Sequence, residues 1–144
     1  MSYPVPSWFS RPLPVALLLL TAAGPPLARS AEPSNADAVA RGRYIVEGLS
    51  KCTRRHTPLN EKGERDRGQW LKGAPIYETP SYPAPNWAVR APRIAGSPPG
   101  TNEDFIRLMT TGIARTGKPP NPPRPDFRMT RADAEAVLAY LKSL

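Results

Sequence analysis

Proline is the residue that most restricts the fold of this chain. The sequence contains 20 prolines in 144 residues, and the stretch from Thr57 to Gly100 has no sustained helical or strand periodicity. Proline lacks a backbone N–H and has a fixed φ, so it is excluded from helix interiors and central strands. A long helix or a large sheet is therefore excluded from this stretch. Its prolines are Pro58, Pro75, Pro80, Pro83, Pro85, Pro92, Pro98 and Pro99.

Three segments outside this stretch have the three-to-four-residue apolar spacing of helices. The first is predicted over 37–49, with Ser34 or Asn35 as its N-cap. Its apolar side is formed by Val39, Ile45, Val46 and Leu49.

The other two predicted helices begin with the same capping pattern. Thr101 is followed three residues later by Asp104, and Gly112 ends this second helix. Thr130 and Asp133 begin the third helix, which continues to the end of the chain. The apolar sides comprise Phe105, Leu108 and Met109 in the second helix, and Ala134, Val137, Leu138, Leu141 and Leu144 in the third.

Residues 1–30 are typical of a cleaved secretory signal peptide. Arg11 precedes an apolar run over 13–23 that is too short to span a bilayer, and small residues at Ala28 and Ser30 favour cleavage before Ala31. An uncleaved membrane anchor and a cytosolic chain remain the alternatives. We expect a mature domain over 31–144, periplasmic or otherwise exported, with no stable membrane span after cleavage.

The mature chain is basic. Without Arg11 and Arg29, the remaining 18 basic and 12 acidic residues give a net charge of +6. No basic helix face with interleaved aromatic residues occurs, so binding to nucleic acid is not favoured. The charge favours docking onto an acidic protein or an anionic membrane surface.

The proline-rich stretch also carries more large apolar residues than a solvated linker needs. Three short helices offer limited surface to pack them, so either a bound apolar cofactor or a partner protein is expected to complete the core. These residues are Trp70, Leu71, Ile76, Tyr77, Tyr82, Trp87 and Ile94.

A candidate cofactor site directly follows the first predicted helix. Cys52 and His56 stand in a Cys-x-x-Arg-His pattern, which differs by one residue from the Cys-x-x-Cys-His motif of c-type haem attachment. Arg55 occupies the position of the second thiol. With one cysteine and one histidine, the chain offers no zinc spacing or Ser-His-Asp set.

The surrounding segments resemble a class I cytochrome c over almost the whole mature chain. The resemblance implies an all-α, cytochrome c-like fold of three main helices with long Pro-rich loops around a haem pocket. It also implies that the first and last helices cross closely, with Gly42 facing Tyr140 or Leu141. The segments that carry it are 42–48, 52–58, Trp87 with 91–96, 111–113, and the proline cluster that leads into 129–144.

The resemblance implies a haem c whose ligands depart from the family pattern. Cys52 would form the single thioether and His56 would be the proximal iron ligand. The family's distal Met position falls on Arg124, whose guanidinium has no lone pair for iron. Met129 could be the distal ligand only if the loop shifts register, and otherwise it is a packing residue at the start of the third helix. Met109 is expected in the core. Arg55 and Arg124 could pair with haem propionates or with acidic neighbours. We expect them to point to solvent instead, because burying a guanidinium beside an apolar ring is costly.

Two functions of different classes follow from this resemblance. The first is an electron carrier rather than an enzyme, docking to an envelope dehydrogenase or terminal oxidase with an acidic surface. The second is a haem-free cytochrome-like module or subunit that acts through protein contacts. In the second case Cys52 would be a buried or reactive thiol or form an intermolecular disulfide, and His56 would be a surface residue.

Overall fold

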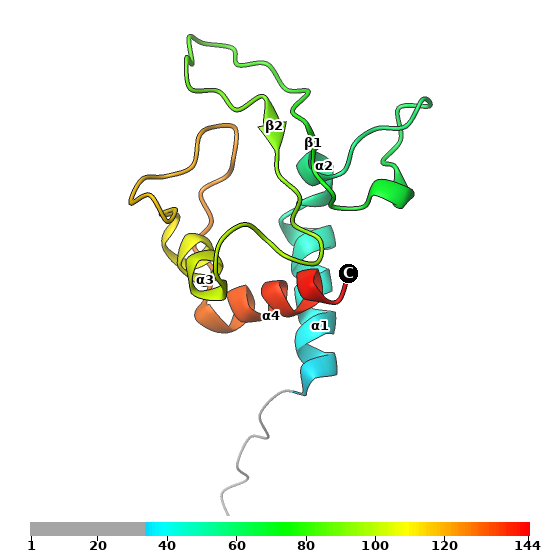
Figure 1. The fold of residues 1–144 in the computed structure, drawn as a ribbon, viewed down its shortest axis with the longest axis vertical. Coiled ribbons are helices and arrows are strands. Elements are labelled where there is room, and N and C mark those ends of the chain that lie inside the picture. The colour runs from blue at the N-terminus through cyan, green and yellow to red at the C-terminus, as the bar shows by residue number, and fades with distance from the viewer. Residues whose placement is uncertain (1–33) are drawn as a thin grey trace, which may run out of the picture. The chain divides into compact units, whose positions relative to one another are not determined.

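Four α-helices and a small two-stranded sheet form the regular structure of residues 34–144, the part of the chain that the computed structural model describes (Figure 1). The expected signal peptide, residues 1–30, lies outside the described residues. The helix-rich arrangement is compatible with a cytochrome c-like fold. The elements in order are α1 Asn35–Arg43, the π-helix η1 Tyr44–Leu49, α2 Thr53–His56, the 3₁₀ turn η2 Arg67–Gln69, β1 Ala74–Pro75, β2 Arg90–Ala91, α3 Asn102–Thr111 and α4 Arg131–Lys142.

The three helix starts that the sequence predicts are confirmed. Ser34 and Thr101 each form a capping box with the aspartate three residues later, and Thr130 accepts a hydrogen bond from the backbone N–H of Asp133. Gly112 ends α3 in the left-handed conformation, with a φ of 73°. The first predicted helix continues past α1 as η1, a change to π geometry that apolar spacing does not reveal.

The small sheet was not predicted from the sequence. β1 and β2 pair antiparallel, with Ala74 opposite Ala91 and Pro75 opposite Arg90. Two residues per strand are too few to show alternation, so no period marks either strand. The remainder of 57–100 consists mostly of loops, as its prolines predict.

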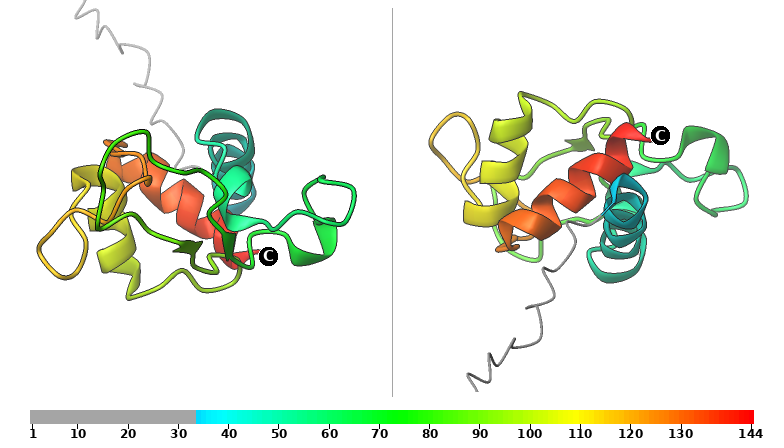
Figure 2. Two further views of the ribbon diagram at one scale, coloured as in Figure 1. Left: turned by 90° about the horizontal axis from the view of Figure 1, so that it is seen from above. Right: turned by 90° about the horizontal axis from the view of Figure 1, so that it is seen from below.

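Helices α1 and α4 cross at close range, and α3 packs against the other end of α4 (Figures 1 and 2). The predicted contact at Gly42 is present. A Cβ atom at this position would collide with the Ala136 carbonyl and with Cβ of Tyr140. Glycine thus permits backbone-to-backbone packing at the crossing. Near it, the Tyr140 hydroxyl donates a hydrogen bond to the Glu47 carboxylate of η1.

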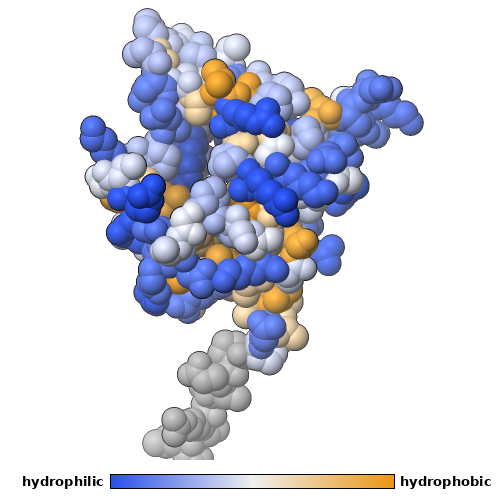
Figure 3. Space-filling model, in the orientation of Figure 1, coloured by the Kyte–Doolittle hydropathy of each residue, from blue (hydrophilic) through white to orange (hydrophobic). Residues whose placement is uncertain are grey.

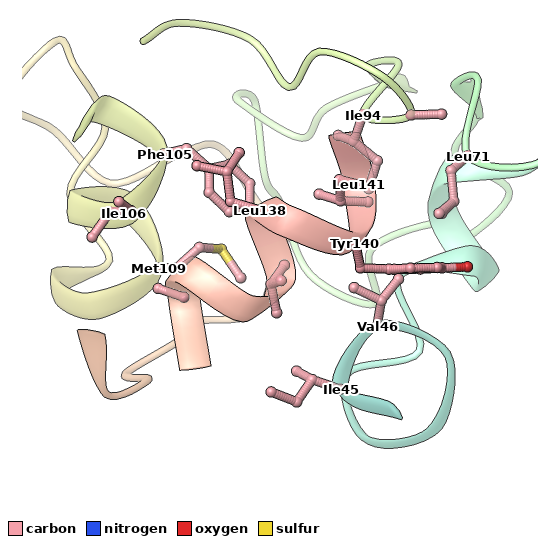
Figure 4. Packing of buried hydrophobic residues seen from close by; sticks show 13 residues of the cluster. Ile45, Val46, Leu71, Ile94, Phe105, Ile106, Met109, Leu138, Tyr140 and Leu141 are labelled. Atoms are coloured by element: carbon pink, nitrogen blue, oxygen red, sulfur yellow. The ribbon is translucent and has the colours of Figure 1, made fainter. Parts of the chain in front are cut away.

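The hydrophobic core lies around α4 (Figure 4). The proline-rich stretch contributes Leu71, which is fully buried, and Ile94. The Leu71 N–H donates to Thr57 Oγ1 at 3.0 Å, and its carbonyl accepts from Ile94 at 2.9 Å. These bonds hold the irregular segment against the helices. The core comprises Ile45, Val46, Leu71, Ile94, Ala95, Phe105, Ile106, Met109, Ala134, Val137, Leu138, Tyr140 and Leu141.

Other large residues of the proline-rich stretch lie at the surface. Tyr77, Tyr82 and Val89 are exposed on the connection between β1 and β2. Figure 3 shows a mostly hydrophilic face with small, separate apolar patches. Among the described residues, no helix has the length and apolar character that crossing a membrane requires.

We predict that Gly42→Ala lowers the free energy of unfolding by about 2 kcal/mol or more, because the added methyl group forces α1 and α4 apart. Urea unfolding measures this change. The control is Gly48→Ala in η1, where the nearest atoms to the new methyl group belong to the Tyr44 ring, at 3.6 and 3.7 Å. Stability there should be unchanged or slightly higher. Equal losses in both variants would show that the crossing is not held by backbone contact.

Candidate functional site

A cavity of about 420 Å³ opens between α2, β2, α3, α4 and the loop that joins α3 to α4. This volume lies within the ordinary range of cofactor and ligand pockets. Most of its wall area is apolar and includes Ile94, Phe105 and Leu141, while its polar lining residues include four arginines and Asp104. Cys52 and His56 both line it, so the structure brings these two predicted site residues together.

One turn of helix places Cys52 and His56 on the same face. The chain turns at Lys51, whose φ of 48° lies in the left-handed region, and α2 begins directly afterwards. The Cys52 N–H donates to the Val46 carbonyl at 2.9 Å, and the Cys52 carbonyl accepts from the His56 N–H at 2.9 Å. Residues four apart on a helix share a face. The side chains of Cys52 and His56 therefore enter the same cavity.

The His56 ring is oriented by a backbone carbonyl. Its Nδ1 lies 2.8 Å from the oxygen of Pro92. A carbonyl only accepts, so Nδ1 carries the proton and Nε2 keeps its lone pair. A hydrogen bond of this kind is typical of histidines that bind metals. Sequence reasoning missed Pro92 as a site residue, because no local pattern pairs a loop carbonyl with a histidine 36 residues away.

Burial keeps the imidazole neutral. It lowers the pKa of His56 below its usual value, the positive charges of Arg124 and Arg55 lower it further, and the bond to Pro92 acts in the opposite direction. The neutral form predominates at pH 7, because the usual pKa of 6.5 already lies below that pH. A neutral imidazole is the form that binds iron.

Burial also keeps the thiol protonated. It raises the pKa of Cys52 to about 11, although the nearby Arg124 guanidinium opposes part of the rise. The thiolate is the nucleophilic form, so a thiol with this pKa is a poor nucleophile at neutral pH. The environment of Cys52 thus disfavours catalysis by a Cys-His pair.

The two arginines do not point to solvent, so that prediction is wrong. Arg55 and Arg124 both line the cavity. The buried Nε of Arg55 has no hydrogen-bond partner in the described structure and lies 3.8 Å from a Glu78 carboxylate oxygen. Glu78, 23 residues later in the sequence, is 33% exposed and provides the opposite charge for both Arg54 and Arg55, at 3.8 Å from each. No local sequence pattern predicts this long-range pairing.

The contacts of Arg124 in the cavity are with uncharged groups. Its Nη2 donates to Met109 Sδ at 3.3 Å, its Nη1 donates to the Pro125 carbonyl at 3.1 Å, and its guanidinium lies 5.1 Å from the centre of the Phe127 ring. Arginine is weakly hydrated and stacks on aromatic faces. These contacts offset part of the free-energy cost of removing the guanidinium from water. That cost was the reason to expect Arg124 at the surface.

The two methionines occupy different places. Met129 packs against the hydrophobic core and is not among the residues that line the cavity. Its backbone N–H donates to the Met109 carbonyl at 2.9 Å. Met109 is buried, as predicted, and also lines the cavity. The apolar spacing of α3 identifies its buried face but does not reveal that this face is also a cavity wall.

The donor set fits a c-type haem on the side of Cys52 and His56. The cavity has the size of a cofactor site and an apolar wall. On this wall lie an imidazole Nε2 with a fixed tautomer and a thiol one helical turn away. Arg55 stands where a second thioether sulfur would be required, so the residues allow one thioether. Arg124 is not a ligand for iron.

Two known proteins that are named as cytochromes are similar to parts of this chain. A 38-residue stretch is 55% identical to a protein named diheme cytochrome c-type from Cereibacter sphaeroides, covering 26% of this chain and 13% of that protein. A second relative is named fructose dehydrogenase cytochrome subunit and comes from Gluconobacter japonicus. It is 29% identical over 109 residues, covering 72% of this chain and 21% of that protein.

These similarities support a relation to the cytochrome c family. The chain spans 13% and 21% of the lengths of these two relatives. No family model matches the chain.

In protein prepared without haem, we predict that Cys52 reacts slowly with a thiol reagent such as DTNB at neutral pH and faster up to about pH 11, because only the thiolate reacts. Arg124→Leu should move the midpoint of the rate profile to higher pH, since it removes a charge that favours the thiolate. Arg115→Leu, at an exposed position, is the control. A wild-type midpoint near that of an ordinary thiol, about 8.5, would contradict the burial effect.

Proposed function

We propose that the chain is an electron carrier that holds one haem c through a single thioether to Cys52 and through His56 as proximal iron ligand. The observation that carries the proposal is the hydrogen bond from His56 Nδ1 to the Pro92 carbonyl, which leaves Nε2 available on the cavity wall that Cys52 shares. The cytochrome relatives support the same cofactor. When bound, the haem would supply the one-electron Fe(III)/Fe(II) couple.

The protein's own residues would orient the cofactor and restrict water. His56 presents a neutral imidazole, and the bond to Pro92 fixes the plane of its ring. Cys52 would fix one edge of the macrocycle. The apolar side chains of α3 and α4 on the cavity wall, Phe105 and Leu141 among them, would exclude water from its faces.

In this proposal the iron has no methionine ligand on the distal side, because the Met109 thioether that reaches the cavity accepts a hydrogen bond from Arg124. Met129 packs against the core, and Arg124 stands in the cavity without a lone pair to offer. Because Met/His ligation raises the reduction potential of a haem, we propose a potential below that of a Met/His cytochrome c.

We further propose export to the cell envelope by residues 1–30 and transient docking to a dehydrogenase or terminal oxidase with an acidic surface. The net charge of +6 on the mature chain supports docking of this kind. Similarity to a fructose dehydrogenase cytochrome subunit supports a dehydrogenase as the partner class.

The test is a reduced pyridine haemochrome spectrum of protein purified from the envelope of its own host. We expect about one haem per chain and a band at longer wavelength than that of a two-thioether haem, because one vinyl group stays unreacted. Cys52→Ala should release any haem to acid-acetone extraction, whereas the neighbouring Thr53→Ala should retain it.

Either of two results would contradict the proposal. A wild-type protein that gives up its haem as readily as Cys52→Ala would show that the attachment is not covalent at Cys52. A protein without a haem band would favour the haem-free module, with Arg55 in place of the second thiol.

A further inference from the structure

His56 is fixed at two points by two segments that lie far from it in the sequence. Its backbone carbonyl accepts a hydrogen bond from the Gly73 N–H at 2.8 Å. Its ring Nδ1 donates to the Pro92 carbonyl, also at 2.8 Å. The main chain and the side chain of this histidine therefore depend on different partners.

Those two partners lie opposite each other at the end of the small sheet. β1 and β2 are antiparallel, with Ala74 opposite Ala91 and Pro75 opposite Arg90. The next position in this register places Gly73 opposite Pro92. The two groups that bind His56 thus come from one cross-strand position, and the pairing of β1 with β2 sets the distance between them.

The backbone at Gly73 leaves no room for a side chain. Its φ of 92° lies in the region that residues with a Cβ atom rarely adopt. A Cβ atom there would lie 2.9 Å from the Arg93 nitrogen, 3.0 Å from the Ala91 carbonyl oxygen and 3.1 Å from the Pro92 carbonyl carbon. All three are backbone atoms, so no side-chain rotation relieves the contact. A larger residue at this position must displace the peptide that orients the imidazole.

Hydrogen bonds on both sides of this contact limit how far the displacement can spread. On one side, the Leu71 carbonyl accepts from the Ile94 N–H at 2.9 Å. On the other side, the Ile76 N–H donates to the Val89 carbonyl at 3.0 Å. The two segments are therefore joined before and after Gly73. A side chain added there would act mainly on the opposite peptide, the one that carries the acceptor for His56.

The geometry points to Gly73 as the positioning residue of the site, because its missing side chain lets the Pro92 carbonyl reach Nδ1 of His56. Gly73 is not among the residues that line the cavity, so it acts through Pro92. The bond to Nδ1 selects the tautomer whose Nε2 keeps its lone pair. The inference rests on the proposed function for the use of that lone pair, which is to bind iron.

The experiment measures how fast the ring N–H of His56 exchanges with water, by nuclear magnetic resonance of ¹⁵N-labelled protein purified from the envelope of its own host. The chain has one histidine, so the ring signal belongs to His56. In wild-type protein the bond to Pro92 should make this exchange slow. Gly73→Ala should accelerate it about tenfold or more, the usual effect of losing one hydrogen bond.

Two glycine variants are the matched controls. Gly63→Ala adds the same methyl group at a φ of 77°, where no atom lies within 4 Å of the new Cβ. Gly42→Ala lowers stability at the α1–α4 crossing and leaves the β1–β2 pair unchanged. The ring N–H should exchange in both at close to the wild-type rate. Far-ultraviolet circular dichroism establishes that each variant is folded.

A second substitution covers the case in which Gly73→Ala does not fold. Gly73→Asn also adds a Cβ atom, but asparagine tolerates a positive φ better than alanine does. It should accelerate the exchange of the His56 ring N–H in the same way. If neither variant folds, the wild-type rate decides, because a ring N–H that exchanges as fast as that of free histidine overturns the inference.

The outcomes separate this inference from the proposed function. Equal exchange rates in wild type and Gly73→Ala overturn the role of Gly73, whether or not haem is present. Equal acceleration in Gly42→Ala or Gly63→Ala also overturns it, because a general loss of stability or of backbone fit would then explain the effect. A protein whose haemochrome spectrum shows no haem, but whose ring N–H responds to Gly73→Ala, overturns the haem proposal and supports the positioning of His56 by Gly73.

Discussion

The close approach of α1 and α4 at Gly42 determines where the candidate site forms. Because Gly42 has no side chain, the backbone of α1 meets that of α4 at Ala136, and η1 and α2 continue from this crossing along the chain. The hydrogen bond from Tyr140 to Glu47 ties η1 to α4 just beyond it. Cys52 and His56 thus reach a cavity whose wall includes residues of α4.

The proline-rich segments form part of the cavity wall. Their backbone carbonyl and N–H groups are hydrogen-bonded, which holds these segments in place. Pro92 cannot donate, but its carbonyl accepts from His56. The Ala88 N–H donates to the Pro122 carbonyl at 2.7 Å, which connects the two proline-rich loops. Irregular backbone is tolerated where its polar groups find partners. These loops therefore provide both a packing surface and an orienting acceptor for the histidine.

The sequence predicts those features that depend on local patterns. Capping residues and apolar spacing identified the starts of α1, α3 and α4, and a four-residue spacing placed Cys52 beside His56. The pairing of β1 with β2 and the contact of His56 with Pro92 join residues without any shared local pattern. Arg55 and Arg124 line the cavity, although the cost of desolvating a guanidinium favours an exposed position. Their partners, Glu78 for Arg55 and Met109 for Arg124, are distant from them in sequence.

The central claim is that His56 binds the iron of a haem within this cavity. A crystal structure of protein purified from its host, with an anomalous difference map at the iron edge, tests it most directly. The account predicts one iron peak in the cavity at coordination distance from His56 Nε2, with Nδ1 still donating to the Pro92 carbonyl. A cavity without an iron peak, or a peak ligated by other residues, would contradict it.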